Sequence, residues 1–279
     1  MKHRWLLFLI AGFVVCSLSI VNHAVAQTDV ALDTEFGARV SVGIDKKVAK
    51  GFHIALNEEV RFDNNFRSFD RLETQLGLSY KVNPYLKFGL GYMFIAPYSS
   101  HNSAFKNLRH RLYADVKGMV YAGSWSFSLK ERFQWTYRMG DFNEYQYPRN
   151  ALTLKSCLMV KYNSRVASPY LYFELRSFLN GPVIRANYDG TNYLTDDGSV
   201  KGEPGWFLHG FKDVYINRYR SCIGVDLRFN KHNRLDVYFL GDWVVDKVVD
   251  ANAEGTKLKS YTKEQGFIGS LGVEYVYAF

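Results

Sequence analysis

His101 and Ser103 are the residues whose spacing comes nearest to a catalytic pair. A histidine could take the proton of the Ser103 hydroxyl, and Asp115 could orient that histidine. The segment around His101 is rich in serine and asparagine and contains Pro97, which predicts a loop and not a rigid strand. We also expect Asp115 to be engaged by Lys130. Because no rigid element would hold the base, we predict no catalytic residues and no enzyme activity.

Metal and disulfide chemistry find little support in the sequence. Apart from His101, four histidines follow the N-terminal segment, and they show no metal-ligand spacing: His53, His110, His209 and His232. We therefore predict no metal and no cofactor. Cys157 and Cys222 lie on segments that one further predicted strand separates, which places them about 9–10 Å apart. A disulfide allows about 7 Å between α-carbons. Both thiols should therefore be free.

Arginine is the most prominent charged residue at the polar positions. If these side chains line an open interior, clustered guanidinium groups favour anions. In the alternative, Asp115, Glu174, Asp226 and Asp242 neutralise the arginines, and the charged groups simply fill the interior. The candidate site residues are Arg109, Arg111, Asp115, Lys130, Arg132, Arg138, Glu174, Arg176, Arg218 and Arg220.

These positions belong to segments in which apolar and polar residues alternate. Residues 34–45 place Phe36, Val40 and Ile44 on one face and Arg39 on the other. The same period recurs at 52–62, 71–82, 85–95, 107–121, 124–138, 150–162, 170–179, 214–229, 234–246 and 266–279. A period of two indicates strands, and segments of about ten residues suit a tilted bilayer crossing. We predict an all-β fold, an antiparallel up-and-down transmembrane β-barrel.

The N-terminal segment indicates export. Lys2 and Arg4 precede an apolar stretch, and Ala24-Val25-Ala26 supplies the pattern that a signal peptidase cuts. We predict a signal peptide over 1–26 and a barrel over 27–279. No later apolar run is long enough for a transmembrane helix. A spanning structure must then be a closed barrel, because only closure leaves no backbone group unpaired in lipid.

The connections alternate in length. Short ones fall at 46–51, 83–84, 122–123, 163–168 and 230–233, and long ones at 63–69, 96–106, 139–149, 180–213 and 247–265. Short periplasmic turns and long external loops are typical of barrels in the outer membrane of Gram-negative bacteria. A soluble barrel has no reason to alternate in this way.

Composition and the C-terminus favour the same compartment. The formal charge is +8 and the aromatic content is 16%. An exported basic chain rarely meets nucleic acid, so we expect outer-membrane lipid and anionic lipopolysaccharide as partners. Tyr275, Tyr277 and Phe279 end the last strand on its apolar face, as in the C-terminal signal that barrel-assembly machinery reads. We expect aromatic side chains near strand ends to anchor the barrel at the membrane interfaces: Tyr80, Tyr92, Phe94, Trp125, Trp135, Tyr137 and Trp243.

Three further details of the barrel can be predicted: its strand number, the register of one hairpin and the surroundings of two carboxylates. Eleven segments are recognisable, whereas outer-membrane barrels usually have an even number of strands. We expect twelve strands, with Gln27–Leu32 as a short extra crossing, and ten is the alternative. A two-residue turn at Ala122-Gly123 places Asp115 opposite Lys130. Glu58 and Glu131 fall on the apolar face, where we expect a bulge, an interface position or a polar partner.

Several short motifs resemble a known family. The stretch Asn107–Asp115, followed by Lys130-Glu131-Arg132-Phe133, is similar to an uncharacterised family of outer-membrane β-barrels, domain of unknown function 2490. Residues 172–176 and 217–220, leading into Gly224-Val225, resemble the same family. The resemblance covers nearly all of the mature chain. It implies a barrel in the outer membrane and no particular activity.

Three functions stay open at this point. The first is an integral barrel with a filled lumen, which we favour because ten to twelve strands is close to the side-chain-filled size. The second is a narrow, anion-leaning channel or transporter. The third is a lipid hydrolase of the outer leaflet, because outer-membrane phospholipases and lipid deacylases use the spacing of His101 and Ser103.

Overall fold

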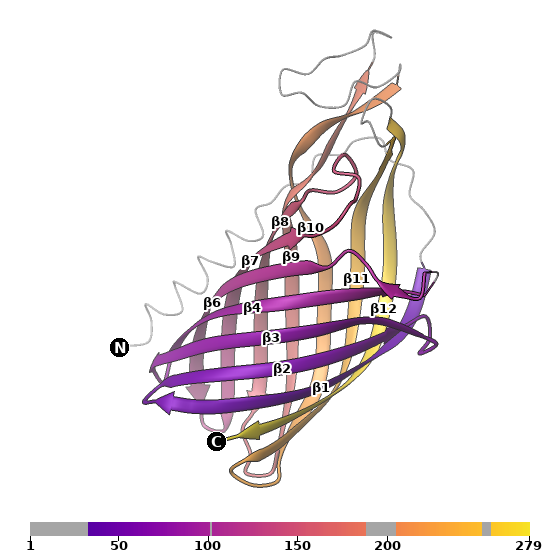
Figure 1. Cartoon of the computed structure of the whole chain (residues 1–279). Coiled ribbons are helices and arrows are strands. Elements are labelled where there is room, and N and C mark those ends of the chain that lie inside the picture. The colour runs from indigo at the N-terminus through magenta and orange to yellow at the C-terminus, as the bar shows by residue number, and fades with distance from the viewer. Residues whose placement is uncertain (1–32, 101, 188–204, 253–257) are drawn as a thin grey trace, which may run out of the picture.

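The chain forms a β-barrel whose wall closes on itself (Figure 1). The computed structural model describes residues 33–100, 102–187, 205–252 and 258–279. The predicted signal peptide and the extra crossing at Gln27–Leu32 lie outside the described residues. The strands are β1 (Asp33–Ala49), β2 (Phe52–Asp63), β3 (Ser68–Asn83), β4 (Leu86–Ser99), β5 (Ala104–Phe105), β6 (Arg109–Ala122), β7 (Trp125–Arg138), β8 (Asn150–Tyr162), β9 (Ala167–Asn187), β10 (Gly205–Arg228), β11 (Asn233–Ala251) and β12 (Leu258–Ala278).

Eleven of these strands form the wall, and the all-β barrel is thereby confirmed. Neighbours along the chain pair antiparallel, and β1 closes the wall by pairing parallel with β12, from Asp33 opposite Gly266 to Asp45 opposite Ala278. An odd wall makes its first and last strands run the same way, so closure needs this parallel pair and no further crossing. The twelfth strand, β5, pairs only with the end of β4.

Within the described residues, no helix is long and apolar enough to cross a membrane.

The two ends of the barrel differ in their connections. At the short-turn end the strands are joined by 50–51, 84–85, 123–124, 163–166 and 229–232, close to the predicted positions. At the opposite, long-loop end, β9 to β12 project beyond the other strands (Figure 1). They take up part of the loops predicted at 180–213 and 247–265. The predicted loop at 63–69 is a tight turn instead, because Asn64 and Asn65 adopt positive φ, which asparagine tolerates.

The hairpin of β6 and β7 corrects one predicted register. Its turn residues are Gly123 and Ser124, so that Asp115 pairs with Arg132 and not with Lys130. Gly123 has a φ of 58°, and glycine at the first central position is typical of a type II′ hairpin turn. The register moves by an even number of residues, so each side chain keeps its predicted face. Lys130 lies opposite Lys117 instead.

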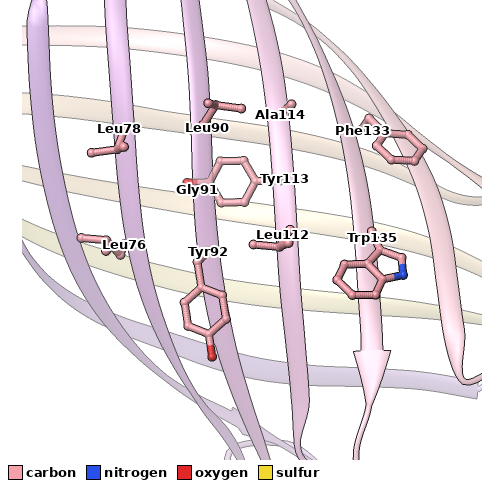
Figure 2. Close-up of a pocket in the computed structure, with 10 residues that line it drawn as sticks. All are labelled: Leu76, Leu78, Leu90, Gly91, Tyr92, Leu112, Tyr113, Ala114, Phe133 and Trp135. Atoms are coloured by element: carbon pink, nitrogen blue, oxygen red, sulfur yellow. The ribbon is translucent and has the colours of Figure 1, made fainter.

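Apolar side chains cover the outside of the wall. Leu90 and Ile223 are 60% and 62% exposed, although both lie within regular strands. A shallow apolar recess of about 500 Å³ on the outer face of β3, β4, β6 and β7 is lined largely by leucines and aromatic rings (Figure 2). On the inside, the ring of Tyr113 fills the space that the missing side chain of Gly91 leaves.

Glu58 and Glu131, the two carboxylates that the alternation places on the outer face, each accept a hydrogen bond from a hydroxyl group. The Ser156 hydroxyl donates to Glu131 at 2.6 Å, and the Thr74 hydroxyl donates to Glu58 at 2.8 Å. Each donor lies on the neighbouring strand. Of the three predicted solutions, a polar partner is the one that the structure shows.

Candidate functional site

The interior is crossed at mid-height by a group of paired charges, which we call the central ion layer: Arg39, Glu59, Arg61, Glu73, Lys155, Glu174, Arg218, Arg220 and Asp242. Asp242 is its most buried member, with a side chain that is 1% exposed. Arg220 donates to Asp242 through Nε and Nη2 at 2.7 and 2.9 Å. Arg218 and Arg39 approach the same carboxylate at 3.4 and 3.6 Å. One buried anion thus binds cations from β1 and β10.

The layer continues from Asp242 toward both neighbouring parts of the wall. Glu73 on β3 accepts a hydrogen bond of 3.0 Å from Arg61, and Arg61 also donates to Glu59. On the other side, Glu174 of β9 lies 3.3 Å from Lys155 and 3.6 Å from Arg220. Within the central ion layer, each charged side chain therefore lies within 4 Å of at least one of opposite sign, as burial requires.

The seven arginines predicted to line the lumen fall into two groups. Arg132 binds Asp115 through two bonds of 3.0 and 2.7 Å, and Arg218 and Arg220 belong to the central ion layer. For these three, the prediction that carboxylates neutralise the arginines is confirmed. The other four, Arg109, Arg111, Arg138 and Arg176, form no ion pair with any described carboxylate.

The four uncompensated arginines lie toward the long-loop end. Arg111 donates to the Thr136 hydroxyl at 2.9 Å, and Arg176 donates to Asn217 at 2.8 Å. Arg109 and Arg138 lie directly opposite each other on β6 and β7, and the Nε atom of each is buried without a hydrogen-bond partner. Like charges opposite one another destabilise a sheet. Arg109 and Arg138 therefore each keep a hydrogen-bond donor free within the described part of the lumen.

A loop reaches over the long-loop end of the barrel. Residues 139–149 join β7 to β8 and contact β11, on another part of the wall. Gln146 donates to Asp250 at 2.8 Å, and Asn143 donates to the Ala251 carbonyl at 2.8 Å. These contacts bind the middle of the loop to the end of β11, across β9 and β10 in the order of the wall.

A cavity of about 680 Å³ lies between the central ion layer and the short-turn end. Its lining includes Lys117, Lys130, Asp236 and Glu274. Of these, only Lys130 is among the site residues that the sequence suggested. Glu274 alternates with the outward Val273 and Tyr275 and could have been assigned to the interior from that pattern.

Of the three residues considered for hydrolytic chemistry, only Ser103 and Asp115 are described, and they lie in different surroundings. His101 lies outside the described residues, and Ser103 lies in the turn before β5 with a φ of 49°. Asp115 is inside the barrel and bound by Arg132. Cys157 and Cys222 are both free, as predicted, since β9 separates their strands.

The predicted assembly signal lies at the short-turn end. The rings of Tyr277 and Phe279 pack edge to face at 4.8 Å, and Phe279 is 59% exposed. Tyr275 donates its hydroxyl to Asn233 on β11. The aromatic end of the chain is thus an outward surface of the wall, available for contact.

Comparison with known proteins supplies a family. Residues 36–189, more than half of the chain, match the family model described as "Protein of unknown function (DUF2490)". The chain belongs to this family. A search of curated proteins finds no match. The match spans β2 to β9 completely and most of β1, and includes Arg109, Arg111, Arg138 and Arg176.

Proposed function

We propose that this DUF2490 protein is an integral barrel of the Gram-negative outer membrane whose lumen is closed at rest by its own side chains. The observation that carries the proposal is the reversal of burial in the wall. Large apolar residues such as Leu90, Leu171 and Ile223 are more than half exposed, while the charged Arg39, Glu73 and Asp242 are buried. A barrel in water has the opposite arrangement.

The height of the apolar surface fits a bilayer. On β7, the outward aromatic residues Trp125 and Trp135 bracket the apolar stretch. The strand rises about 33 Å between them, or about 25 Å along the axis of a barrel with strands tilted by about 40°. The apolar band of outer-membrane barrels is about 25 Å tall.

Aromatic side chains border this surface at both levels. Near the short turns, the ring centroids of Trp125 and Tyr162 are 5.2 Å apart. Toward the long loops, the ring centroids of Trp135 and Tyr137 are 6.4 Å apart. Rings of this kind anchor barrels at the two interfaces. We place the short-turn end in the periplasm, with Tyr275, Tyr277 and Phe279 contacting the assembly machinery. The long-loop end then faces lipopolysaccharide.

The central ion layer and the loop at 139–149 support a closed lumen. A conducting path would have to separate Asp242 from Arg220 or pass between Glu174 and Lys155, and both pairs are largely buried. The uncompensated Arg109, Arg111, Arg138 and Arg176 favour a second function, passage of anions when the layer opens. Clustered guanidinium groups would give such a path anion selectivity.

The experiment refolds the mature chain in detergent and follows heat-modifiable migration in gels, then measures conductance of the same sample in planar bilayers. We expect a shift between boiled and unboiled samples and no resting conductance. A chain that stays soluble and monomeric without detergent would contradict the membrane barrel. Steady channel conductance would contradict the closed lumen but not the membrane barrel. If such channels prefer anions and lose that preference in Arg109→Gln/Arg138→Gln, the second function is supported. Lipase activity abolished by Ser103→Ala would indicate a hydrolase instead.

A further inference from the structure

Two rows of like charge face the same part of the lumen. Four lysines on consecutive wall strands form successive cross-strand pairs, and we call them the lysine row: Lys81 on β3, Lys87 on β4, Lys117 on β6 and Lys130 on β7. On β10, β11 and β12, Asp226 lies opposite Asp236, and Asp236 lies opposite Glu274. Ser41 of β1 then links Glu274 to Glu59 on β2. We call Glu59, Glu274, Asp236 and Asp226 the carboxylate row.

The central residues of each row have no ion-pair partner among the described residues. Asp236 receives the Tyr170 hydroxyl at 2.8 Å, and Glu274 receives the Asn57 amide at 2.7 Å. Neither carboxylate forms an ion pair within the described part of the chain. The Oδ1 atoms of Asp236 and Asn57 are buried without a donor.

The lysine row shows the same lack of compensation. Lys117 and Lys130 form no ion pair with a described carboxylate. The two lysines also lie directly opposite each other on neighbouring strands. Like charges in that position are destabilising. A sheet with uncompensated rows of both signs is less stable than one in which the signs alternate, unless a bound group supplies the missing charges.

The central pairs of the two rows, Lys117 with Lys130 and Asp236 with Glu274, lie on opposite sides of one cavity. In the order of the wall, at least three strands separate β6 and β7 from β11 and β12 in either direction. Lys117 and Lys130, and Asp236 and Glu274, all line the cavity of about 680 Å³. That volume is in the range of sites that hold small organic ligands, roughly 300–1,000 Å³.

Solvent exposure indicates the side from which a ligand enters. At the short-turn end of the cavity, the side chains of Arg234 and Asp45 are 37% and 27% exposed. Where the cavity meets the central ion layer, side-chain exposure falls to 9% at Glu174 and 6% at Glu73. Access is therefore from the short-turn end.

We propose that this cavity binds a small zwitterion with an amine at one end and a carboxylate at the other, such as an amino acid or a short peptide. Its ammonium group binds Asp236 and Glu274, and its carboxylate binds Lys117 and Lys130. The field between the rows orients such a molecule across the lumen, whereas a simple anion or cation satisfies only one wall. The inference rests on the proposed function for the compartment: the short-turn end faces the periplasm, so the ligand comes from there.

The test measures binding of three uncharged-side-chain peptides to the refolded full barrel in detergent by titration calorimetry. The probes are triglycine, N-acetyl-triglycine and triglycine amide. The first carries both charges, and each of the others lacks one. We expect triglycine to bind at least tenfold more tightly than either blocked form. Equal binding of all three, or no binding of triglycine at millimolar concentration, would overturn the proposal without any variant.

Variants assign the two ends of the ligand. Lys117→Gln/Lys130→Gln should weaken triglycine at least tenfold and leave the binding of triglycine amide unchanged. Asp236→Asn/Glu274→Gln should also weaken triglycine binding at least tenfold but leave the binding of N-acetyl-triglycine unchanged. Glu144→Gln, in the loop at the long-loop end, is the matched control and should not change the binding of any probe. Equal loss for every probe would contradict the assignment. Heat-modifiable migration of each sample reports the barrel separately, so a failed membrane barrel is distinguished from a failed binding site.

Discussion

Replacing Asp242 with asparagine should destabilise the barrel strongly, because one carboxylate serves three cations. The substitution keeps the volume and removes the charge that binds Arg220 at 2.7 Å, Arg218 at 3.4 Å and Arg39 at 3.6 Å. Removing one partner of a buried ion pair costs about 3–5 kcal/mol. The side chain is 1% exposed, so water cannot replace the lost charge. At about 1.4 kcal/mol per tenfold, the unfolding equilibrium should shift by about 100- to 4,000-fold.

The assay is equilibrium unfolding of the refolded barrel by urea in lipid vesicles, followed by tryptophan fluorescence and by the fraction of heat-modifiable protein. Glu144→Gln is the control, since its carboxylate also binds one arginine, Arg149, but its side chain is 56% exposed. The control should match the wild type within error. If Asp242→Asn is no less stable than Glu144→Gln, the central ion layer does not hold the barrel together, and the reasoning is wrong.

Three further changes have defined outcomes. Gly91→Ala should lower the free energy of unfolding by about 1–3 kcal/mol, because its new methyl group would meet the Tyr113 ring at 2.2 Å; urea midpoints measure this. Phe279→Ala should leave refolding in detergent unchanged but reduce the heat-modifiable form in outer-membrane fractions of cells. A maleimide should label Cys157 and Cys222 only after denaturation, because the residues are 6% and 2% exposed; intact mass counts the labels.

Each of these predictions has its own control or contrary result. Gly118→Ala adds a methyl group with its nearest neighbour at 4.0 Å, so it should cost less than the change at Gly91. Phe105→Ala removes an exposed ring from β5 and should not affect assembly. Normal outer-membrane levels of Phe279→Ala would refute the assembly role. A faster-migrating band under non-reducing conditions would show that the cysteines can pair.

The alternation of side chains was sufficient to predict the wall, because a closed barrel assigns every second residue to one face. Alternation does not predict the strand ends or the registers, because these depend on the turns. At Gly123, a positive φ moved the turn by one residue and exchanged the partner of Asp115 from Lys130 to Arg132. The parallel pairing of β1 with β12 had no local signal at all, because closure of the wall is decided by strands distant in sequence.

The candidate site was predicted in kind but not in arrangement. The sequence identified Arg109, Arg138 and Arg220 as interior residues, yet it could not say which of them meet a carboxylate. That depends on which residues share a register: Arg220 lies opposite Asp242, whereas Arg109 lies opposite Arg138. The cavity at the short-turn end is lined by residues of all eleven wall strands, so it depends on every register and could not be predicted from the sequence.

Adjacent residues on β9 offer the most direct measurement of which face meets lipid. Leu171 is 56% exposed on the outside, and Tyr172 lines the cavity within the barrel. A bimane label would be placed at Leu171→Cys or at Tyr172→Cys, with Cys157 and Cys222 changed to serine, in vesicles containing brominated lipid. Quenching by the lipid at 171 and by aqueous iodide at 172 is the predicted result. Lipid quenching at 172, or at neither position, would contradict the orientation of the wall.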